Sequence, residues 1–376
     1  MERQTGKNKN SSLKIFRNIL IFGLLVWLTF FIIFKDQNPN DMVEVFSKTN
    51  GLFILLGVVC MFGYFLCESI NLRRTLNELG EKVKLRSALK YVLIGFFYSS
   101  ITPAATGGQP MQIYYMHKDG VKAANATLAL VLNLFSFQVV TILMAIISVF
   151  VFHQYLDVGL TILFFIGIGL NSCALALLII GIFSKKLSTA LVNFTIKVMK
   201  KFKVKNIEKK VESLTNSLDK YNGSAKYIRN NKKIIIKQFL TQFVQQFLYY
   251  SVPFMAYRAL GFSGQSLIKI VCLQSIVYAT VSGIPSPGAV GVSEGAFVSL
   301  FKPIFGAQAI NSAMLLNRGI SFYLFVLICA IIVIINTFRD KKEQEIELEL
   351  EKKLAKNVAQ NVEQNIEKNI EENIEE

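Results

Sequence analysis

The sequence predicts an all-α polytopic membrane protein with about six full spans and two re-entrant helical hairpins, arranged as an inverted repeat. Three observations lead to this prediction. Hydrophobic residues make up 52% of the 376-residue chain and charged residues only 18%, whereas a soluble domain carries roughly a quarter charged residues. The hydrophobic residues are grouped into blocks of about twenty, which is the length of a helix that crosses a bilayer. Two further apolar blocks are interrupted by glycine and proline.

Six apolar blocks are long enough for full spans. The first follows a basic N-terminus, as in a signal peptide, but a lysine and an aspartate come after it instead of a small-residue cleavage site. We therefore expect it to remain as an anchor. The expected spans are residues 15–34, 52–70, 123–152, 158–183, 234–257 and 310–338.

Lysine and arginine in the connections predict the orientation of the spans, because these residues are enriched in cytoplasmic loops. They are abundant in the N-terminal segment, after the second span and in residues 184–233. By contrast, residues 35–50 and 153–157 carry little or no net positive charge. We expect a multi-pass protein of the bacterial cell membrane with both termini in the cytoplasm.

The two interrupted blocks, residues 85–117 and 267–301, are predicted to be re-entrant hairpins. Basic residues flank the first at both ends, so both ends belong on the cytoplasmic side. The same count puts both ends of the second outside. Each half of the chain is then span, span, hairpin, span, with reversed directions in the second half, a plan found in many transporters. The alternative is eight ordinary spans, two of which are kinked.

This plan divides the chain into four parts. Residues 1–183 form the first membrane half, residues 184–233 a basic cytoplasmic amphipathic linker, residues 234–338 the second membrane half and residues 339–376 an acidic low-complexity tail. Lysines of the linker would be attracted to the anionic inner leaflet. No nucleic-acid partner is expected, because no aromatic or glycine pattern accompanies the basic run.

The interruptions in the hairpins are candidates for a binding site. An irregular turn at membrane depth is tolerated only where protein or a wet cavity surrounds it, because unpaired backbone groups are costly in hydrocarbon. We expect the second helix of each hairpin to begin near Pro110 and near Pro287, with free N–H groups pointing toward the midplane, where a phosphate could bind. The candidate residues of the tips are Thr102, Pro103, Gly107, Gly108 and Pro110, and Pro287, Gly288 and Gly291.

Two charged residues in the second half are candidates because an ionisable side chain at membrane depth is often functional. Arg318 lies inside the last span, and Glu294 lies one turn into the second helix of the second hairpin. Arg318 could hold a lipid phosphate through paired hydrogen bonds. Alternatively, the two side chains pair with each other and lock the helices.

A polar stripe marks the fifth span. Gln242, Gln245, Gln246 and Tyr249 have the spacing i, i+3, i+4 and i+7, so they share one helical face. This face either lines the cavity or packs against another helix.

No metal, cofactor or catalytic triad is predicted. The five cysteines lie in apolar stretches without a CxxC pair, and the two histidines are far apart in the sequence. The cysteines are therefore interpreted as small buried hydrophobic residues.

Two segments resemble the signature loops of the lysylphosphatidylglycerol synthase transmembrane (flippase-like) family. They are Thr-Pro-Ala-Ala-Thr-Gly-Gly-Gln-Pro, which begins at Thr102, and Pro-Ser-Pro-Gly-Ala-Val-Gly-Val-Ser-Glu-Gly, which begins at Pro285. The resemblance implies that the protein handles aminoacylated phospholipid. In full-length members it implies translocation of lysyl-phosphatidylglycerol to the outer leaflet, which gives resistance to cationic antimicrobial peptides. It also implies lipid-binding roles for Gln109, Glu294 and Arg318.

The sequence departs from the family pattern after the last span. Full-length synthases transfer lysine from lysyl-tRNA in a C-terminal soluble domain, whereas here a short acidic tail follows Phe338. We therefore expect flippase-like translocation or binding of phosphatidylglycerol or its lysyl ester, which a separate synthase would make. The alternatives are a phosphatidylglycerol lysyltransferase, as the family name suggests, and an ion-coupled small-solute transporter.

Overall fold

The computed structural model describes residues 49–102, 105–183, 207–282 and 291–339, together with Ser47 and a few positions between 189 and 199. Within these ranges the chain forms helices and short turns and contains no strand, which confirms the all-α prediction. The chain divides into two compact units, residues 1–327 and 328–376. The contacts described below all belong to the first unit.

Four helices of the described residues are long and apolar enough to cross a membrane. Three of them are α3 (Gly51–Glu78), α6 (Ala123–Phe152) and α7 (Val158–Phe183), which correspond to predicted spans. The fourth continues from α13 (Val292–Arg318) through a π-helical turn to Arg339. The predicted span 15–34 lies outside the described residues.

The predicted span 234–257 is two helices, α10 (Lys232–Tyr250) and α11 (Val252–Ala259). The helix is interrupted at Ser251, because Pro253 in the first turn of α11 has no N–H that could continue the helical hydrogen bonds. This pair of helices is not among the four apolar ones, so the number of spans stays a prediction.

Large apolar side chains cover the outside of the long helices. On α6, the side chains of Leu143, Ile147 and Phe150 are 54%, 61% and 81% exposed, and α7 exposes a similar set. An apolar surface of this size, on helices long enough to cross a membrane, is typical of contact with lipid and agrees with a protein that is buried in a bilayer.

The first interrupted block forms a hairpin of α4 (Leu85–Ile101) and α5 (Gly108–Lys118). Its two ends meet, because Asp119 after α5 lies 2.5 Å from Lys90 Nζ and accepts a hydrogen bond from the hydroxyl of Tyr91, both in α4. The hairpin form of this block is confirmed.

The second block is also a hairpin, formed by α12 (Leu267–Val281) and the first part of α13. The ring of Phe262, just before α12, lies 5.8 Å from the ring of Phe305, and both rings pack against Tyr257. At Gly306, φ is 73°, and the regular helix is interrupted there, between the predicted hairpin and the predicted last span. The tip, residues 283–290, lies outside the described residues.

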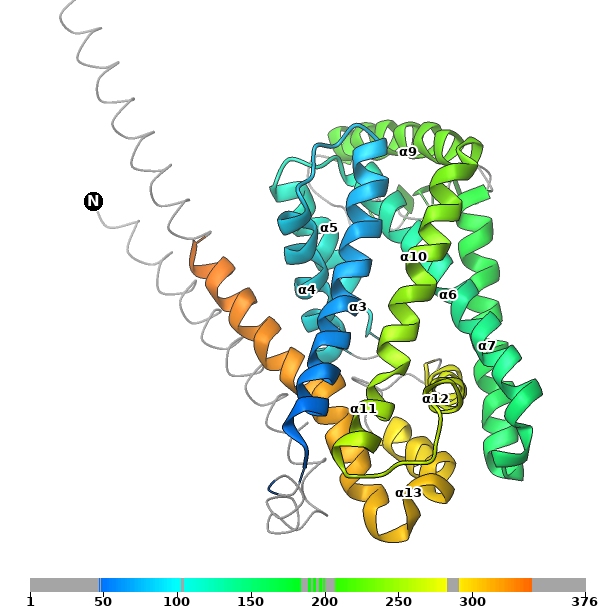
Figure 1. Ribbon diagram of the computed structural model, residues 1–376. Helices are drawn as coiled ribbons and strands as arrows, with labels where there is room; N and C mark the ends of the chain where they lie inside the picture. The colour runs from blue at the N-terminus through cyan, green and yellow to red at the C-terminus, as the bar shows by residue number, and fades with distance from the viewer. Residues whose placement is uncertain are drawn as a thin grey trace, which may run out of the picture. The chain divides into compact units, whose positions relative to one another are not determined.

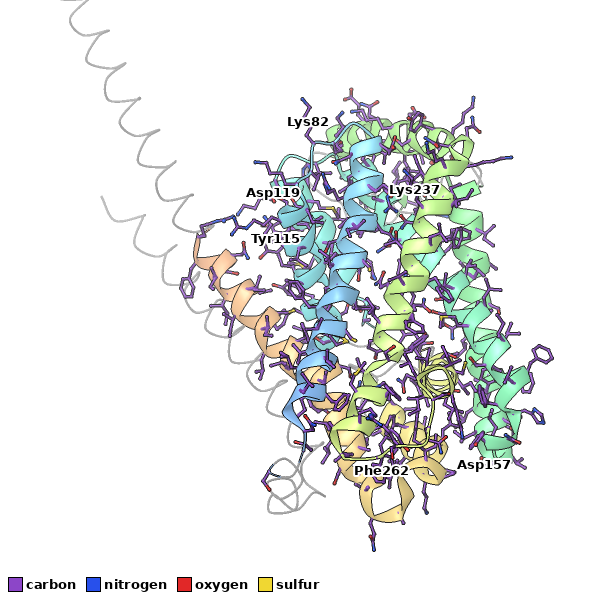
Figure 2. The ribbon with its side chains drawn as sticks, viewed as in Figure 1. Lys82, Tyr115, Asp119, Asp157, Lys237 and Phe262 are labelled. Atoms are coloured by element: carbon purple, nitrogen blue, oxygen red, sulfur yellow. The ribbon has the colours of Figure 1, made fainter. Side chains whose placement is uncertain are left out.

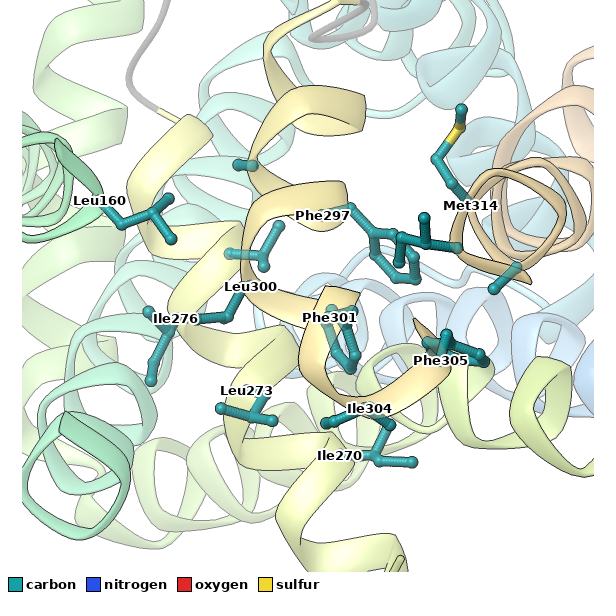
Figure 3. Packing of buried hydrophobic residues seen from close by; sticks show 14 of the residues in the cluster. Leu160, Ile270, Leu273, Ile276, Phe297, Leu300, Phe301, Ile304, Phe305 and Met314 are labelled. Atoms are coloured by element: carbon teal, nitrogen blue, oxygen red, sulfur yellow. The ribbon is translucent and has the colours of Figure 1, made fainter. Parts of the chain in front are cut away.

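Apolar residues hold the second hairpin together. Figure 3 shows Leu300 of α13 on the side of Leu273 and Ile276 of α12, while Phe297 of the same cluster points toward Met314. Burial of these side chains against each other fixes α12 next to α13, so the position of the tip follows from the hydrophobic core.

The two hairpins enter from opposite ends of the same helices. Helix α3 has 28 residues and is therefore about 42 Å long at about 1.5 Å per residue. Next to its first turn, the N–H of Asn50 donates to the carbonyl of Ala259 at 2.9 Å, close to where the second hairpin begins. Just beyond its other end, the carboxylate of Glu81 accepts from the N–H of Lys122 at 3.3 Å, where the first hairpin ends.

The two ends of α6 also lie next to different hairpins. It starts directly after the first hairpin, and beyond its other end the ring of Tyr155 lies 4.7 Å from Lys269 Nζ in the first turn of α12. Figure 2 shows Lys82 and Asp119 at one end of the helices and Phe262 and Asp157 at the other. The opposed hairpin entrances agree with the inverted plan.

The hairpins differ in direction. In Figure 1, α4 and α5 run alongside α3, whereas α12 is seen nearly end on and crosses the direction of α3 and α10. The two hairpins therefore enter from opposite ends, but their tilts relative to α3 are not related by the same inversion.

The described part of the predicted linker is helix α9 (Ile207–Asn230), which Figure 1 shows lying across one end of the helices. Ala225 is buried with Leu128 of α6 and Ile234 of α10. The hydroxyl of Ser224 donates to Asn125 Oδ1 at 2.9 Å. The linker is therefore docked on both membrane halves at this end.

Candidate functional site

A cavity of about 380 Å³ lies between the two hairpins. The first hairpin contributes residues on both sides of its turn, and the second contributes the last residues of α12 and the first turn of α13. Helices α3, α6 and α10, the end of α13 with Arg318, and the π-helical turn complete the wall. The polar and charged lining residues are Tyr64, Glu68, Ser99, Ser100, Gln109, Gln112, Asn133, Gln245, Tyr249, Gln274, Tyr278, Ser282, Ser293, Glu294, Asn317, Arg318 and Ser321.

The ion pair of Arg318 and Glu294 is the main charged feature of this cavity. Arg318 Nε donates to Glu294 Oε1 at 2.7 Å, and both side chains are largely buried. The guanidinium lies 4.8 Å from the centre of the Phe322 ring. The pairing that was one alternative is therefore present, and both partners also line the cavity.

Glu294 has a second role at the start of α13. Its Oε2 accepts from the N–H of Gly291 at 2.7 Å and from Ser293 Oγ at 2.9 Å. A carboxylate at a helix N-terminus is favourable because it caps free N–H groups and faces the positive end of the dipole. The helix begins at Val292, after a glycine with φ of 83°, and not near Pro287 as expected. The N–H of Gly291, next to this helix start, is therefore already paired with a side chain of the protein.

The residues of the first tip have different roles. Gln109 lines the cavity. The hydroxyl of Thr102 accepts from the N–H of Gly107 at 2.9 Å and donates to the carbonyl of Tyr98 at 2.6 Å, so it closes the turn. A Cβ on Gly108 would lie 2.8 Å from the carbonyl oxygen of Gly95, so this glycine allows α5 to approach α4.

Several predicted tip residues are not placed at the cavity. Thr102, Gly107, Gly108, Pro110 and Gly291 are absent from its lining. Pro103, Pro287 and Gly288 lie outside the described residues. In the described part of the first tip, Thr102 and the two glycines therefore shape the turn, while Gln109 reaches the cavity.

The polar stripe of α10 divides between the two alternatives. Gln245 and Tyr249 line the cavity. Gln246 Nε2 donates to the carbonyl of Phe137 at 2.8 Å and to Thr141 Oγ1 at 2.9 Å, so this residue packs α10 against α6. Gln242 is fully buried outside the cavity lining, and neither polar atom of its side chain has a partner among the described residues.

Comparison with known proteins shows the family of the chain. Residues 15–329 match the family model described as lysylphosphatidylglycerol synthase TM region. The chain belongs to this family. It is thus a multi-pass membrane protein, and the predicted family is confirmed.

Two relatives of this family member are named UPF0104 membrane protein. The one from Archaeoglobus fulgidus is 20% identical over 315 residues, which cover 82% of this chain and 94% of the relative. The one from Methanothermobacter thermautotrophicus is 20% identical over 297 residues, which cover 76% and 86%. Both alignments span most of the membrane region, and both names indicate only a membrane location.

The sequence analysis missed one carboxylate that this family member places at the cavity. Glu68 lies in α3, lines the cavity and accepts a hydrogen bond from Gln245 Nε2 at 3.4 Å. The signal was present, because Glu68 is the one acidic residue in the predicted span 52–70, and the argument that selected Glu294 applies to it equally. Tyr64 and Tyr278, which also line the cavity, have no such signal, because tyrosine is uncharged and is frequent near the ends of membrane spans.

Proposed function

We propose that this protein binds a phospholipid head group between its two hairpins and moves it between the leaflets of the bacterial cell membrane. The observation that carries the proposal is the cavity of about 380 Å³ between hairpins that enter from opposite ends, with Arg318 and Glu294 in its wall. Small-molecule sites are typically about 300–1,000 Å³ in volume. The cavity is therefore large enough for a head group.

Arg318 supplies the chemistry for the phosphate. A guanidinium is planar and permanently charged, and it recognises phosphate by paired hydrogen bonds. Pairing with Glu294 offsets the cost of the charge at depth while no ligand is bound. A lipid phosphate would then compete with Glu294 for the same group.

The substrate class follows from the family. The family description refers to lysylphosphatidylglycerol synthase, so aminoacylated phospholipid, with lysyl-phosphatidylglycerol as the example, is the proposed cargo. Delivery of this lipid to the outer leaflet lowers the negative surface charge and so weakens attraction of cationic antimicrobial peptides. A separate synthase would supply the lipid, and both termini would be cytoplasmic.

Reconstitution tests the proposal. The full-length chain is placed in liposomes that contain fluorescent phosphatidylglycerol or its lysyl ester, and the accessible fraction of the label is followed with a membrane-impermeant quencher. We expect the wild-type chain to exchange label between leaflets and Arg318→Ala to slow this at least tenfold. Lys302→Ala, which removes an exposed cation from the same helix, is the matched control.

Two results would contradict the proposal. One is wild-type exchange no faster than in protein-free liposomes. The other is formation of lysyl-lipid by the purified chain from lysyl-tRNA and phosphatidylglycerol without any exchange, which would indicate a transferase.

A further inference from the structure

Glu68 differs from the other carboxylate of the cavity in having no basic partner among the described residues. Glu294 is paired with Arg318, whereas in the described part of the chain Glu68 is bonded only to the amide of Gln245, at 3.4 Å, and forms no ion pair. A charged carboxylate at membrane depth without a cation is costly. A cation brought by the ligand would offset this cost.

Three tyrosines line the same cavity as Glu68. The ring of Tyr249 contacts the rings of Tyr64 and Tyr278. The ring centres of Tyr64 and Tyr249 are 5.4 Å apart, and those of Tyr249 and Tyr278 are 5.7 Å apart. Aromatic faces beside a carboxylate are the groups that bind an ammonium ion, because the ring faces carry negative potential.

The neighbouring Tyr250 shows what a packing tyrosine looks like in this helix. It is fully buried, donates to Gln246 Oε1 at 3.3 Å and is absent from the cavity lining. Tyr64, Tyr249 and Tyr278 instead line the cavity. They are therefore able to contact a ligand.

The two charged groups come from different helices, Glu68 from α3 and Arg318 from the end of α13, and both line this cavity together with Tyr249, whose ring touches that of Tyr64. One cavity thus holds a carboxylate in one part of its wall and a guanidinium in another. A head group with both a phosphate and an amine satisfies the two at once.

We propose that Glu68, with Tyr64, Tyr249 and Tyr278, is a subsite for the primary ammonium of a phospholipid head group, and that it selects amine-bearing lipids over phosphatidylglycerol. This inference rests on the proposed function and deepens it, because phosphate binding at Arg318 alone does not distinguish these lipids. Glu68 and Tyr64 both lie in α3, so this helix would determine which lipid is preferred.

Lipid binding to the purified full-length chain tests the subsite. The probes are phosphatidylglycerol, its lysyl ester and phosphatidylethanolamine with the same acyl chains, each titrated in detergent and followed by native mass spectrometry. We expect the wild-type chain to bind the two amine lipids about tenfold more tightly than phosphatidylglycerol, since a hydrogen bond to a charged group contributes about that much. Glu68→Gln should remove this preference and leave phosphatidylglycerol binding within twofold.

Two further variants control for folding. Glu78→Gln makes the same change at an exposed position of α3 and should keep the preference. Glu68→Asp keeps the charge but withdraws it by one methylene, and it should weaken the preference without abolishing it. An equal loss of all three lipids in Glu68→Gln, or wild-type binding that favours phosphatidylglycerol, would overturn the subsite while leaving the proposed function intact.

The source of the amine is tested by competition. Glycerophosphoethanolamine carries the same head group without acyl chains, and we expect it to displace phosphatidylethanolamine only at concentrations far above that of the lipid. Displacement at equal concentration would assign the subsite to a soluble amine and overturn the lipid assignment. A wild-type chain that binds none of the three lipids would overturn the proposed function as well.

Discussion

At the scale of single residues, the pair of Arg318 and Glu294 joins the last turn of α13 to its first and lines the cavity. Removal of one partner of a buried ion pair leaves an uncompensated charge, which destabilises a protein by about 3–5 kcal/mol. A single substitution therefore mixes loss of folding with loss of binding, and a variant that removes both charges separates the two.

We expect Arg318→Gln to lower the free energy of unfolding by about 3 kcal/mol, whereas the double variant Arg318→Gln with Glu294→Gln recovers most of it. A glutamine at 294 retains a side-chain oxygen that can accept the hydrogen bond from the N–H of Gly291, as Glu294 does in the wild-type chain. Lipid exchange should be lost in both variants, because the phosphate has no guanidinium. Thermal unfolding in detergent and liposome exchange measure the two effects. A stable double variant with normal exchange would show that the pair only locks the helices.

The sequence indicated the charged residues of the site better than its uncharged ones. Arg318 and Glu294 stand out because charges are rare in apolar blocks, and Glu68 could have been found by the same criterion. The hydrogen bond by which Thr102 closes the turn at Gly107 could not have been predicted, because a hydroxyl that closes a turn and one that binds a ligand have the same sequence signal. Which role applies depends on packing that only the fold reveals.

At the scale of helices, α10 shows what a periodic pattern can and cannot predict. The i, i+3, i+4, i+7 spacing placed four polar residues on one face, and they do lie toward the protein interior. The neighbours change along the helix, however, so Gln245 lines the cavity, Gln246 bonds to α6 and Gln242 has no partner among the described residues. Periodicity gives a face, and the partners come from tertiary structure.

Gln242→Leu and Gln246→Leu form a matched pair on this helix. A buried amide without a partner costs about 1–3 kcal/mol, so leucine at 242 should raise the apparent melting temperature. Leucine at 246 removes bonds to Phe137 and Thr141 and should destabilise by about 0.6 kcal/mol per bond, the average for side-chain bonds in membranes. Thermal unfolding of both variants measures the difference. A destabilised Gln242→Leu would indicate that this amide is hydrated or bonded in the membrane.

Helix α7 fixes the second hairpin through a glycine. A Cβ on Gly167 would lie 2.3 Å from the carbonyl oxygen of Ala279 near the end of α12, and that oxygen cannot move without its helix. Asn171, one turn further, donates to the same carbonyl at 3.1 Å. The end of α12, which leads into the cavity, is therefore positioned by α7.

Gly167→Ala should push α12 away from α7, lower stability by about 1–3 kcal/mol and slow lipid exchange. Gly169→Ala is the control, because a Cβ there meets nothing within 4 Å and alanine favours a helix by about 1 kcal/mol. Exchange rates and melting temperatures of the two variants are compared in one experiment. Equal behaviour of both would mean that the packing of α12 on α7 does not position the cavity.

At the scale of the molecule, the sequence predicted helix positions better than helix directions. The bounds expected for residues 123–152 and 158–183 agree with α6 and α7, because apolar length and flanking polar residues set where a span begins and ends. The crossing direction of α12 was not predictable, since tilt is set by packing against neighbouring helices. Opposed hairpins could be inferred from charges, whereas their unequal tilt required the fold.

The opposed entrances lead to a prediction about sidedness. The chain without its native cysteines receives one cysteine at a time at exposed positions, Arg86 and Lys118 at the first entrance and Ser263 and Lys302 at the second. Because α3 and α6 separate the two entrances, a membrane-impermeant maleimide added from outside should label the second pair in intact cells. The first pair should be labelled only after the membrane is opened. If Arg86 and Lys118 reacted from different sides, the block 85–117 would cross the membrane, and a cavity between two opposed hairpins could no longer explain how a head group is bound.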